Sequence, residues 1–344
     1  MKASYFRYVL DFKQASGTSR GILKQKETWF IKLEHKDKWG IGECGILRGL
    51  SCDDRPDFEE KLKWVCENIA LGHDALYSAI KEFPSIQMGI EIAFKSFEAE
   101  DPYQLFPSDF TDSKGTLPIN GLIWMGDPSF MMRQIEDKLE SGFSCIKVKV
   151  GALSFDQELT VFKSIRARFS KEDITLRLDA NGAFSPLEAP SKLKALSAFN
   201  IHSIEQPIEV GQIESMTKLC KNTPVPIALD EELIGVFETS QKAKLLDEVK
   251  PQYIILKPSF IGGFKGAQDW IDLANDRNIG WWVTSALESN VGLNAISQWT
   301  YTLNPIGAQG LGTGSLFTNN IDSPLEVKNG YIGYTKLKKW KVIQ

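Results

Sequence analysis

Short apolar runs recur at a regular spacing over the last two thirds of this 344-residue chain. Eight runs begin 25 to 30 residues apart, at 119–123, 145–150, 175–178, 201–204, 226–229, 253–256, 280–283 and 306–309. Each gap is long enough for one helix, and a strand and helix repeat of this size is typical of a parallel sheet. Eight strands predict a closed (β/α)-barrel of the α/β class. An open doubly wound sheet is the competing architecture, and it is disfavoured because no GxGxxG turn follows the first run.

The first hundred residues follow a different pattern. Apolar and polar residues alternate over 27–46 around a turn-forming Lys-Asp-Lys-Trp-Gly, which predicts an antiparallel hairpin, and 1–12 adds a strand. Helical spacing follows over 57–99. We therefore expect an α+β capping domain over 1–103 and a barrel domain over 104–321. The alternating segment within 322–344 is expected to rejoin the capping domain.

Composition limits the class of partner. The formal charge of −4 comes from 40 basic and 44 acidic residues without long runs, so neither nucleic acid nor a membrane surface is expected as a partner. The five cysteines are odd in number and form no CxxC pair, which favours reduced thiols and a cytoplasmic location. No apolar stretch approaches the length of a membrane span. A small molecule is the expected partner, and the sequence specifies no oligomeric state.

Charged residues end five consecutive runs of the predicted barrel, where catalytic groups of such barrels lie. They are Lys147, Lys149, Asp179, Glu205, Asp230 and Lys257. The i, i+2 spacing of the first two lysines places both on one face of their strand. Taken singly, each aspartate could cap a helix and each lysine could be a solvated side chain or half of a surface ion pair. Those interpretations do not explain carboxylates on three successive strands with lysines on both sides.

Three converging carboxylates repel one another unless a cation lies between them. Oxygen donors favour a hard ion, so Mg²⁺ is the expected cofactor, with Mn²⁺ as a possible substitute, and the lack of a Cys or His cluster disfavours zinc. A dication would stabilise the negative charge that develops when a proton is removed next to a carboxylate. The lysines would then move the proton. A histidine base is not expected, since His202 lies three residues before Glu205 and so on the other face of its strand.

The succession KxK, DAN, E, DE and K at these run ends resembles the enolase superfamily, in its muconate-lactonizing-like branch. The segments GECGILRGLS (42–51), LPINGLIWMG (117–126), TSALESNVGLNA (284–295) and GLGTGSLFTNN (310–320) are similar to the o-succinylbenzoate synthase family, which are dehydratases of menaquinone biosynthesis. The resemblance covers the chain from the first hairpin to about residue 320. It implies a modified TIM barrel, (β/α)7β, with a capping domain.

The resemblance also implies roles for individual residues. Asp179, Glu205 and Asp230 match the metal ligands, Lys149 the base, Lys147 its neighbour and Lys257 the lysine that stabilises an enediolate. The implied reaction is Mg-dependent dehydration of 2-succinyl-6-hydroxy-2,4-cyclohexadiene-1-carboxylate to o-succinylbenzoate, in which Lys149 takes a proton and returns one to the departing hydroxide.

Substrate contacts are implied as well. Arg48, Gly49 and Ser51 resemble a capping-domain loop that closes over substrate, although Ile46, Leu47 and Arg48 replace the Pro-Leu-Pro often found there. Ser285 resembles a contact to the substrate carboxylate, and Asn181 of the DAN motif is also expected to contact the substrate. 

Three alternatives remain open on the sequence. An N-succinylamino acid racemase or dipeptide epimerase of the same superfamily would use the same pair of opposed lysines. A Schiff-base aldolase would use Lys257 or Lys149 as a nucleophile. A non-catalytic barrel would retain the fold as a binding protein.

Overall fold

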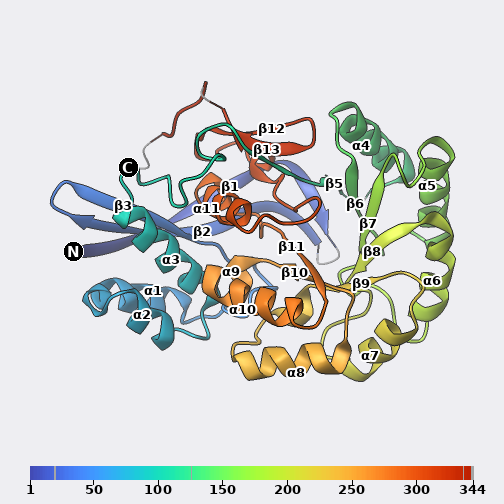
Figure 1. The fold of residues 1–344 in the computed structure, drawn as a ribbon, viewed down its shortest axis with the longest axis horizontal. Coiled ribbons are helices and arrows are strands. Elements are labelled where there is room, and N and C mark those ends of the chain that lie inside the picture. Colours follow the sequence, from blue (N-terminus) through green and yellow to red (C-terminus); the bar gives the residue numbers. More distant parts are fainter. Residues whose placement is uncertain (19–20, 125, 336, 342–344) are drawn as a thin grey trace.

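The computed structural model describes residues 1–18, 21–124, 126–335 and 337–341 (Figure 1). The chain opens with an antiparallel sheet in the order β1 (Lys2–Thr18), β2 (Gly21–His35) and β3 (Lys38–Cys44). Helices α1 (Phe58–Glu67), α2 (His73–Ala79) and α3 (Pro84–Glu98) follow, with a short 3-10 turn η1 (Ile69–Leu71) between the first two. The predicted hairpin and helical region are both confirmed.

Helix α3 packs closely on β3 because glycines line the contact. A Cβ added at Gly42 would lie 1.9 Å from the carbonyl oxygen of Gly89, and one at Gly89 would lie 2.1 Å from Cys44 Sγ. The helix buries Ile86, Ile90 and Ala93 against the sheet in the capping-domain core. Side chains smaller than a methyl group are therefore required where the two backbones approach.

The second part of the chain forms a parallel sheet that curls into the predicted barrel. Seven strands pair in chain order: β5 (Gly121–Ile123), β6 (Cys145–Lys149), β7 (Thr175–Asp179), β8 (Ile201–Glu205), β9 (Ile227–Leu229), β10 (Tyr253–Leu256) and β11 (Gly280–Val283). The helices that lie between and after them are α4 (Pro128–Glu140), α5 (Phe155–Arg168), α6 (Ala189–Leu196), α7 (Ile213–Asn222), α8 (Thr239–Val249), α9 (Pro258–Ile261), α10 (Gly263–Asn275) and α11 (Asn290–Thr302). Short 3-10 helices lie between these elements at η2 (Ser197–Phe199) and η3 (Glu231–Leu233), and after α11 at η4 (Gly314–Leu316). The strands carry apolar residues that pack against the helices in one large core. The predicted α/β-barrel fold is confirmed.

The expected eighth strand over 306–309 is wrong in its extent. Ile306 is 95% exposed, and Gly307 has a positive φ of 76°, which breaks an extended strand. Parallel bridges instead pair Gln309 with Ile119 and Gly310 with Thr284. These two residues close the gap between β11 and the segment that leads into β5.

The C-terminal segment forms a hairpin of β12 (Leu325–Lys328) and β13 (Tyr331–Tyr334). It pairs with β4 (Thr116–Pro118), just before the first barrel strand, and Ile332 packs into the barrel core. Beyond it, the Trp340 ring stacks on Tyr103 with centroids 4.0 Å apart, in a cluster that includes Phe30 of β2. The hairpin thus adds to the barrel side, and Trp340 beyond it reaches the capping domain. In the described ranges, no helix combines the length and apolar character needed to cross a bilayer.

Two buried glutamates of the capping domain cap helices of the barrel domain. Glu91 on α3 accepts hydrogen bonds from the backbone N–H groups of Phe264 (2.5 Å) and Lys265 (3.1 Å) in the first turn of α10. Glu43 on β3 accepts from the N–H groups of Ser289 and Gly292, each at 2.8 Å, where α11 begins. Free N–H groups at a helix start favour a negative charge. The domains are therefore joined at two helix N-termini.

Candidate active site

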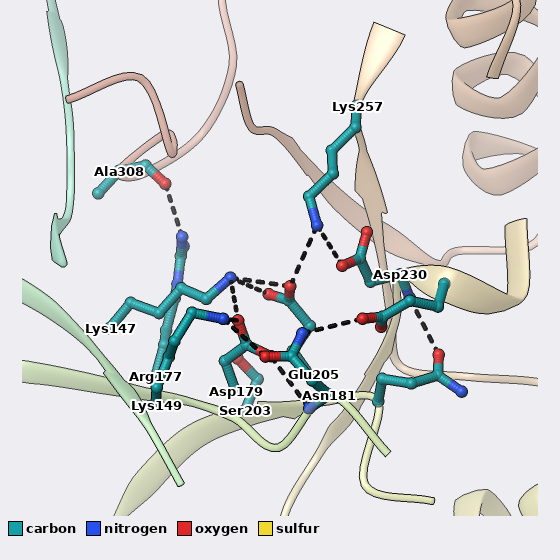
Figure 2. Close-up of polar contacts among 12 residues, drawn as sticks. Lys147, Lys149, Arg177, Asp179, Asn181, Ser203, Glu205, Asp230, Lys257 and Ala308 are labelled. Carbon is teal, nitrogen blue, oxygen red and sulfur yellow. Dashed lines mark hydrogen bonds and ion pairs between the residues drawn. The ribbon is translucent and has the colours of Figure 1, made fainter. Parts of the chain in front are cut away.

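The predicted lysines and carboxylates converge at the carboxyl ends of the barrel strands (Figure 2). Parallel pairing sets Lys149 beside Asp179 and Asp179 beside Glu205, so the three lie at one level of the sheet. Lys147 lies one inward-facing position lower on β6. Its Nζ donates to both carboxylate oxygens of Glu205, at 2.8 and 2.6 Å, and lies 2.9 Å from Asp179 Oδ2.

Lys149 lies at the rim of this cluster. Its Nζ is 3.0 Å from Asp179 Oδ2 and 2.6 Å from Asn181 Oδ1. Asn181 adopts a left-handed conformation with φ 43°, and its amide also donates to Glu231 Oε1 at 2.9 Å. Asn181 thereby links the Lys149 ammonium to Glu231.

Lys257 follows β10 and approaches the carboxylates from the opposite side. Its ammonium pairs with Asp230 and lies 3.8 Å from Glu205 Oε1. Burial alone would lower the pKa of Lys257, but the carboxylates of Asp230 and Glu205 outweigh it and hold the pKa well above its ordinary value. The lysine is therefore a cation at neutral pH.

The carboxylate of Asp179 responds in the opposite sense. Burial would raise its pKa, but the ammonium groups of Lys147 and Lys149 outweigh that effect, and the pKa is held below its ordinary range. The side chains of Asp179, Glu205 and Asp230 are each only 2% exposed. Among the described residues, no three acidic, cysteine or histidine groups meet at metal-binding spacing, and the ammonium of Lys147 bridges two of the three carboxylates.

A cavity of about 360 Å³ lies over the cluster and is bounded by both domains. Lys147, Lys149, Asp179 and Lys257 form part of its floor on the barrel side. Leu47, Arg48 and Leu50 from the loop after β3, with Gln14 and Leu23 from β1 and β2, contribute from the capping domain. A ligand there would be enclosed between the two domains.

The expected substrate contacts divide into two groups. Ser285 and Asn181 line the cavity, and Ser285 Oγ lies 2.5 Å from Thr313 Oγ1. Gly49 and Ser51 are not among the lining residues: Gly49 donates its N–H to Asp54, and Ser51 Oγ accepts from Leu47 N. These two shape the loop from within.

Arg48 lines the cavity, but its guanidinium is already paired. It donates to Glu27 Oε2 at 2.7 Å and to Asp54 Oδ1 at 2.5 Å, and it lies over the Trp29 ring. Two carboxylates thus offset its charge. The side chain is 53% exposed at the cavity edge.

Sequence reasoning missed several residues of the cavity wall. Thr313 lies in the segment 310–320 and Asn120 in the segment 117–126. Both segments resemble the family, but the resemblance did not identify either residue as part of the cavity. Asn120 is buried, and its Oδ1 has no hydrogen-bond partner among the described residues. Phe260, Leu287 and Leu316 supply apolar wall and follow no polar pattern that the sequence would reveal.

The position of His202 differs from the prediction that it lies on the face of its strand opposite Glu205. A register shift between β7 and β8 pairs Leu176 with Ile201 but Arg177 with Ser203, so His202 is the extra residue of a bulge. Its ring stacks on Tyr253 and contacts Trp282 in a buried aromatic cluster. Burial lowers the pKa of His202 to about 4. His202 is therefore a neutral packing residue, and because of the bulge, simple alternation along β8 does not predict the orientation of its side chain.

Comparison with known proteins gives consistent results for both domains. Residues 1–97 match the model of the MenC N-terminal domain, and residues 131–336 match the enolase C-terminal domain-like model. The o-succinylbenzoate synthase of Desulfotalea psychrophila is 43% identical over 97% of this chain and 99% of its own length. The crystal structure of MenC from that organism superposes with a TM-score of 0.87 at 41% identity, covering 97% of this chain and 99% of that one.

A more distant structure shares the fold. The dipeptide epimerase of Enterococcus faecalis, solved with Mg and the dipeptide L-Leu-L-Tyr, gives a TM-score of 0.82 at 18% identity over 97% of this chain and 96% of its own. The family of this protein is therefore assigned from sequence identity across both domains, and not from the fold alone. The chain belongs to the o-succinylbenzoate synthase (MenC) family of the enolase superfamily, and it is an enzyme of the hydro-lyase type that menaquinone biosynthesis uses.

Proposed function

We propose that this enzyme dehydrates 2-succinyl-6-hydroxy-2,4-cyclohexadiene-1-carboxylate to o-succinylbenzoate, acting on a small-molecule carboxylate in the cytoplasm. One observation carries the proposal: Lys149 pairs with Asp179 and Lys257 with Asp230, at the two ends of one row of buried carboxylates, and both lysines line the same cavity. The 43% identity to an o-succinylbenzoate synthase over 97% of the chain supports the choice of substrate.

Proton transfer falls to Lys149 in this proposal. Acting as the base, Lys149 takes the proton from the ring carbon next to the carboxylate and then gives a proton to the departing hydroxyl, so that water leaves and the ring becomes aromatic. Asn181, 2.6 Å away, positions the amine. Lys257 stays protonated and stabilises the dianionic enediolate as a fixed cation.

Asp179, Glu205 and Asp230 are the proposed ligands of Mg²⁺, for which Mn²⁺ could substitute. The donors suit such an ion in kind, because three buried carboxylates on successive strands already pair with ammonium groups, although in this structure Lys147 lies between two of them and the described groups do not stand at metal-binding spacing. When bound, the ion would stabilise negative charge on the substrate carboxylate. Lys147, which bridges Asp179 and Glu205, would keep their oxygens oriented.

Racemization of N-succinyl amino acids or epimerization of dipeptides is the second candidate. It is favoured by one feature, the lysine on each side of the site, since inversion at a carbon needs a proton donor opposite the base. The dipeptide epimerase with the same fold illustrates that the barrel accommodates this chemistry.

The test combines both reactions on purified protein. With Mg²⁺, we expect formation of aromatic product from the cyclohexadiene, and loss of activity in EDTA that Mg²⁺ restores. Racemization of N-succinyl amino acids without dehydration would refute the first proposal, whereas activity that survives EDTA with a borohydride-trapped adduct would indicate a Schiff-base aldolase. Absence of any turnover would leave a binding protein.

Lys149→Ala tests the base. Turnover should fall at least about 10²- to 10⁴-fold, the usual contribution of a positioned base, while Mg²⁺ still binds. Lys163→Ala, on the exposed face of α5, is the matched control and should retain full activity. Near-normal rates in Lys149→Ala would remove this residue from the base role.

A further inference from the structure

A buried lysine lies outside the catalytic cluster, where the capping domain meets the barrel. Lys26 of β2 is 3% exposed, and its Nζ has no hydrogen-bond partner among the described residues. An isolated buried ammonium is costly, so a compensating negative charge is expected close by.

Two buried carboxylates flank Lys26, one from each domain. Glu43 and Glu288 are both 0% exposed, and both act on the Lys26 ammonium through their charge. A Cβ placed on Gly45 would lie 3.0 Å from Lys26 Nζ and 3.6 Å from Glu288 Cγ, so both side chains lie under this glycine. Burial lowers the pKa of Lys26, and the two carboxylates oppose that effect.

The two glutamates hold different parts of the barrel mouth. Glu43 caps α11 through Ser289 and Gly292, and it also accepts from Thr28 Oγ1 at 2.9 Å. Glu288 accepts from Ser259 Oγ at 2.6 Å and from Ala286 N at 2.7 Å. These bonds tie the loop after β11 to the capping domain on one side and to the segment after Lys257 on the other.

The tied loops form walls of the cavity. Thr284, Ser285, Ala286 and Leu287 line it from the barrel, and the loop that follows Glu43 lines it from the capping domain. Removing the Lys26 charge would leave two buried carboxylates facing each other, and their repulsion would push apart the two domains at the cavity wall.

We infer that Lys26 is a positioning residue: its ammonium holds Glu43 of the capping domain and Glu288 of the barrel together, and thereby sets the loop that carries Ser285 against the bound substrate. This inference rests on the proposed function in treating that cavity as the substrate site. It assigns Lys26 no contact with substrate.

The variants are Lys26→Met, which keeps an unbranched side chain, one atom shorter and uncharged, and Lys26→Met combined with Glu288→Gln, which also removes one of the two negative charges and keeps an acceptor for Ser259. Lys24→Met, at an exposed position two residues earlier on β2, is the matched control. We expect Lys26→Met to raise KM at least tenfold with a smaller change in kcat. The double variant should return KM to within about threefold of wild type, and Lys24→Met should not differ from wild type.

Amide hydrogen exchange of 284–292 supplies a readout that needs no turnover. Protection of this segment should fall in Lys26→Met and recover in the double variant, even if the wild-type enzyme rejects the cyclohexadiene; failure of the proposed function is thus separable from failure of this inference. A lower melting temperature with wild-type KM and unchanged exchange would reduce Lys26 to a purely structural residue and overturn the inference. So would a double variant no better than Lys26→Met.

Discussion

Replacing Glu91 by glutamine removes one titrating carboxylate from the contact between the two domains. The side chain is 5% exposed and accepts from the backbone of Phe264 and Lys265 at the start of α10. Burial raises the pKa of Glu91 from 4.5 to about 7; the two backbone hydrogen bonds and the charges of Lys95 and Lys265 oppose the rise without cancelling it. The folded protein therefore holds this proton more tightly than the unfolded chain.

The sign and size of the effect on stability follow from that difference. A raised carboxyl pKa contributes stability below the unfolded value of 4.5, and the contribution is lost as the pH rises through 7. Each unit of pKa difference corresponds to about 1.4 kcal/mol, so the full contribution is about 3 kcal/mol. Glu91→Gln has no proton to release. Its stability relative to wild type should accordingly rise by about 3 kcal/mol between pH 4.5 and pH 8.

Urea unfolding of wild type and Glu91→Gln across this pH range measures the difference directly. Subtracting the two curves cancels the other titrating groups, which both proteins share. Glu98→Gln, at the exposed end of the same helix, is the control for the exchange of a glutamate for a glutamine. A flat difference for Glu91→Gln would show that its carboxylate is as well solvated in the fold as in water, and would refute the reasoning.

Two further predictions concern packing and thiol chemistry. Gly42→Ala should lower the free energy of unfolding by about 3 kcal/mol, the upper end of overpacking costs, because its Cβ would meet the backbone oxygen of Gly89 at 1.9 Å; an unchanged urea midpoint would contradict this. Burial raises the pKa of Cys52 and Cys220 to about 12 and that of Cys66 to about 11, so the native protein should react slowly with Ellman's reagent at pH 8, and all five thiols should react after denaturation. Rapid release of one equivalent from the native protein would mean that one thiol is far more ionised than its burial allows.

The barrel and its charged strand ends were predictable because both depend on local patterns. Each strand is a short apolar run, and parallel pairing in chain order brings residues such as Asp179 and Glu205 to one level without further information. Sequence spacing did not reveal where the pattern is interrupted. The bulge at His202 and the positive φ at Gly307 are set by tertiary packing, and each displaced one prediction.

The loop after β3 shows the same limit for substrate contacts. Resemblance drew attention to 48–51, but the pairing of Arg48 with Glu27 and Asp54 depends on side chains 21 residues before and 6 residues after it. No periodic pattern links these three positions. The cavity wall from Phe260 and Leu316 is likewise apolar, so the sequence does not distinguish it from core.

The capping of α10 and α11 by glutamates from the other domain bears on how this gene product can be divided. A barrel expressed without its first hundred residues would lose the carboxylates that cap two of its helices and would expose the apolar face that the capping domain covers. The fragment 1–100, in turn, would expose Glu43 and Glu91, which are buried in the whole protein. Separate expression of residues 1–103 and 104–344 should therefore yield two poorly soluble pieces, whereas their co-expression should restore a soluble complex.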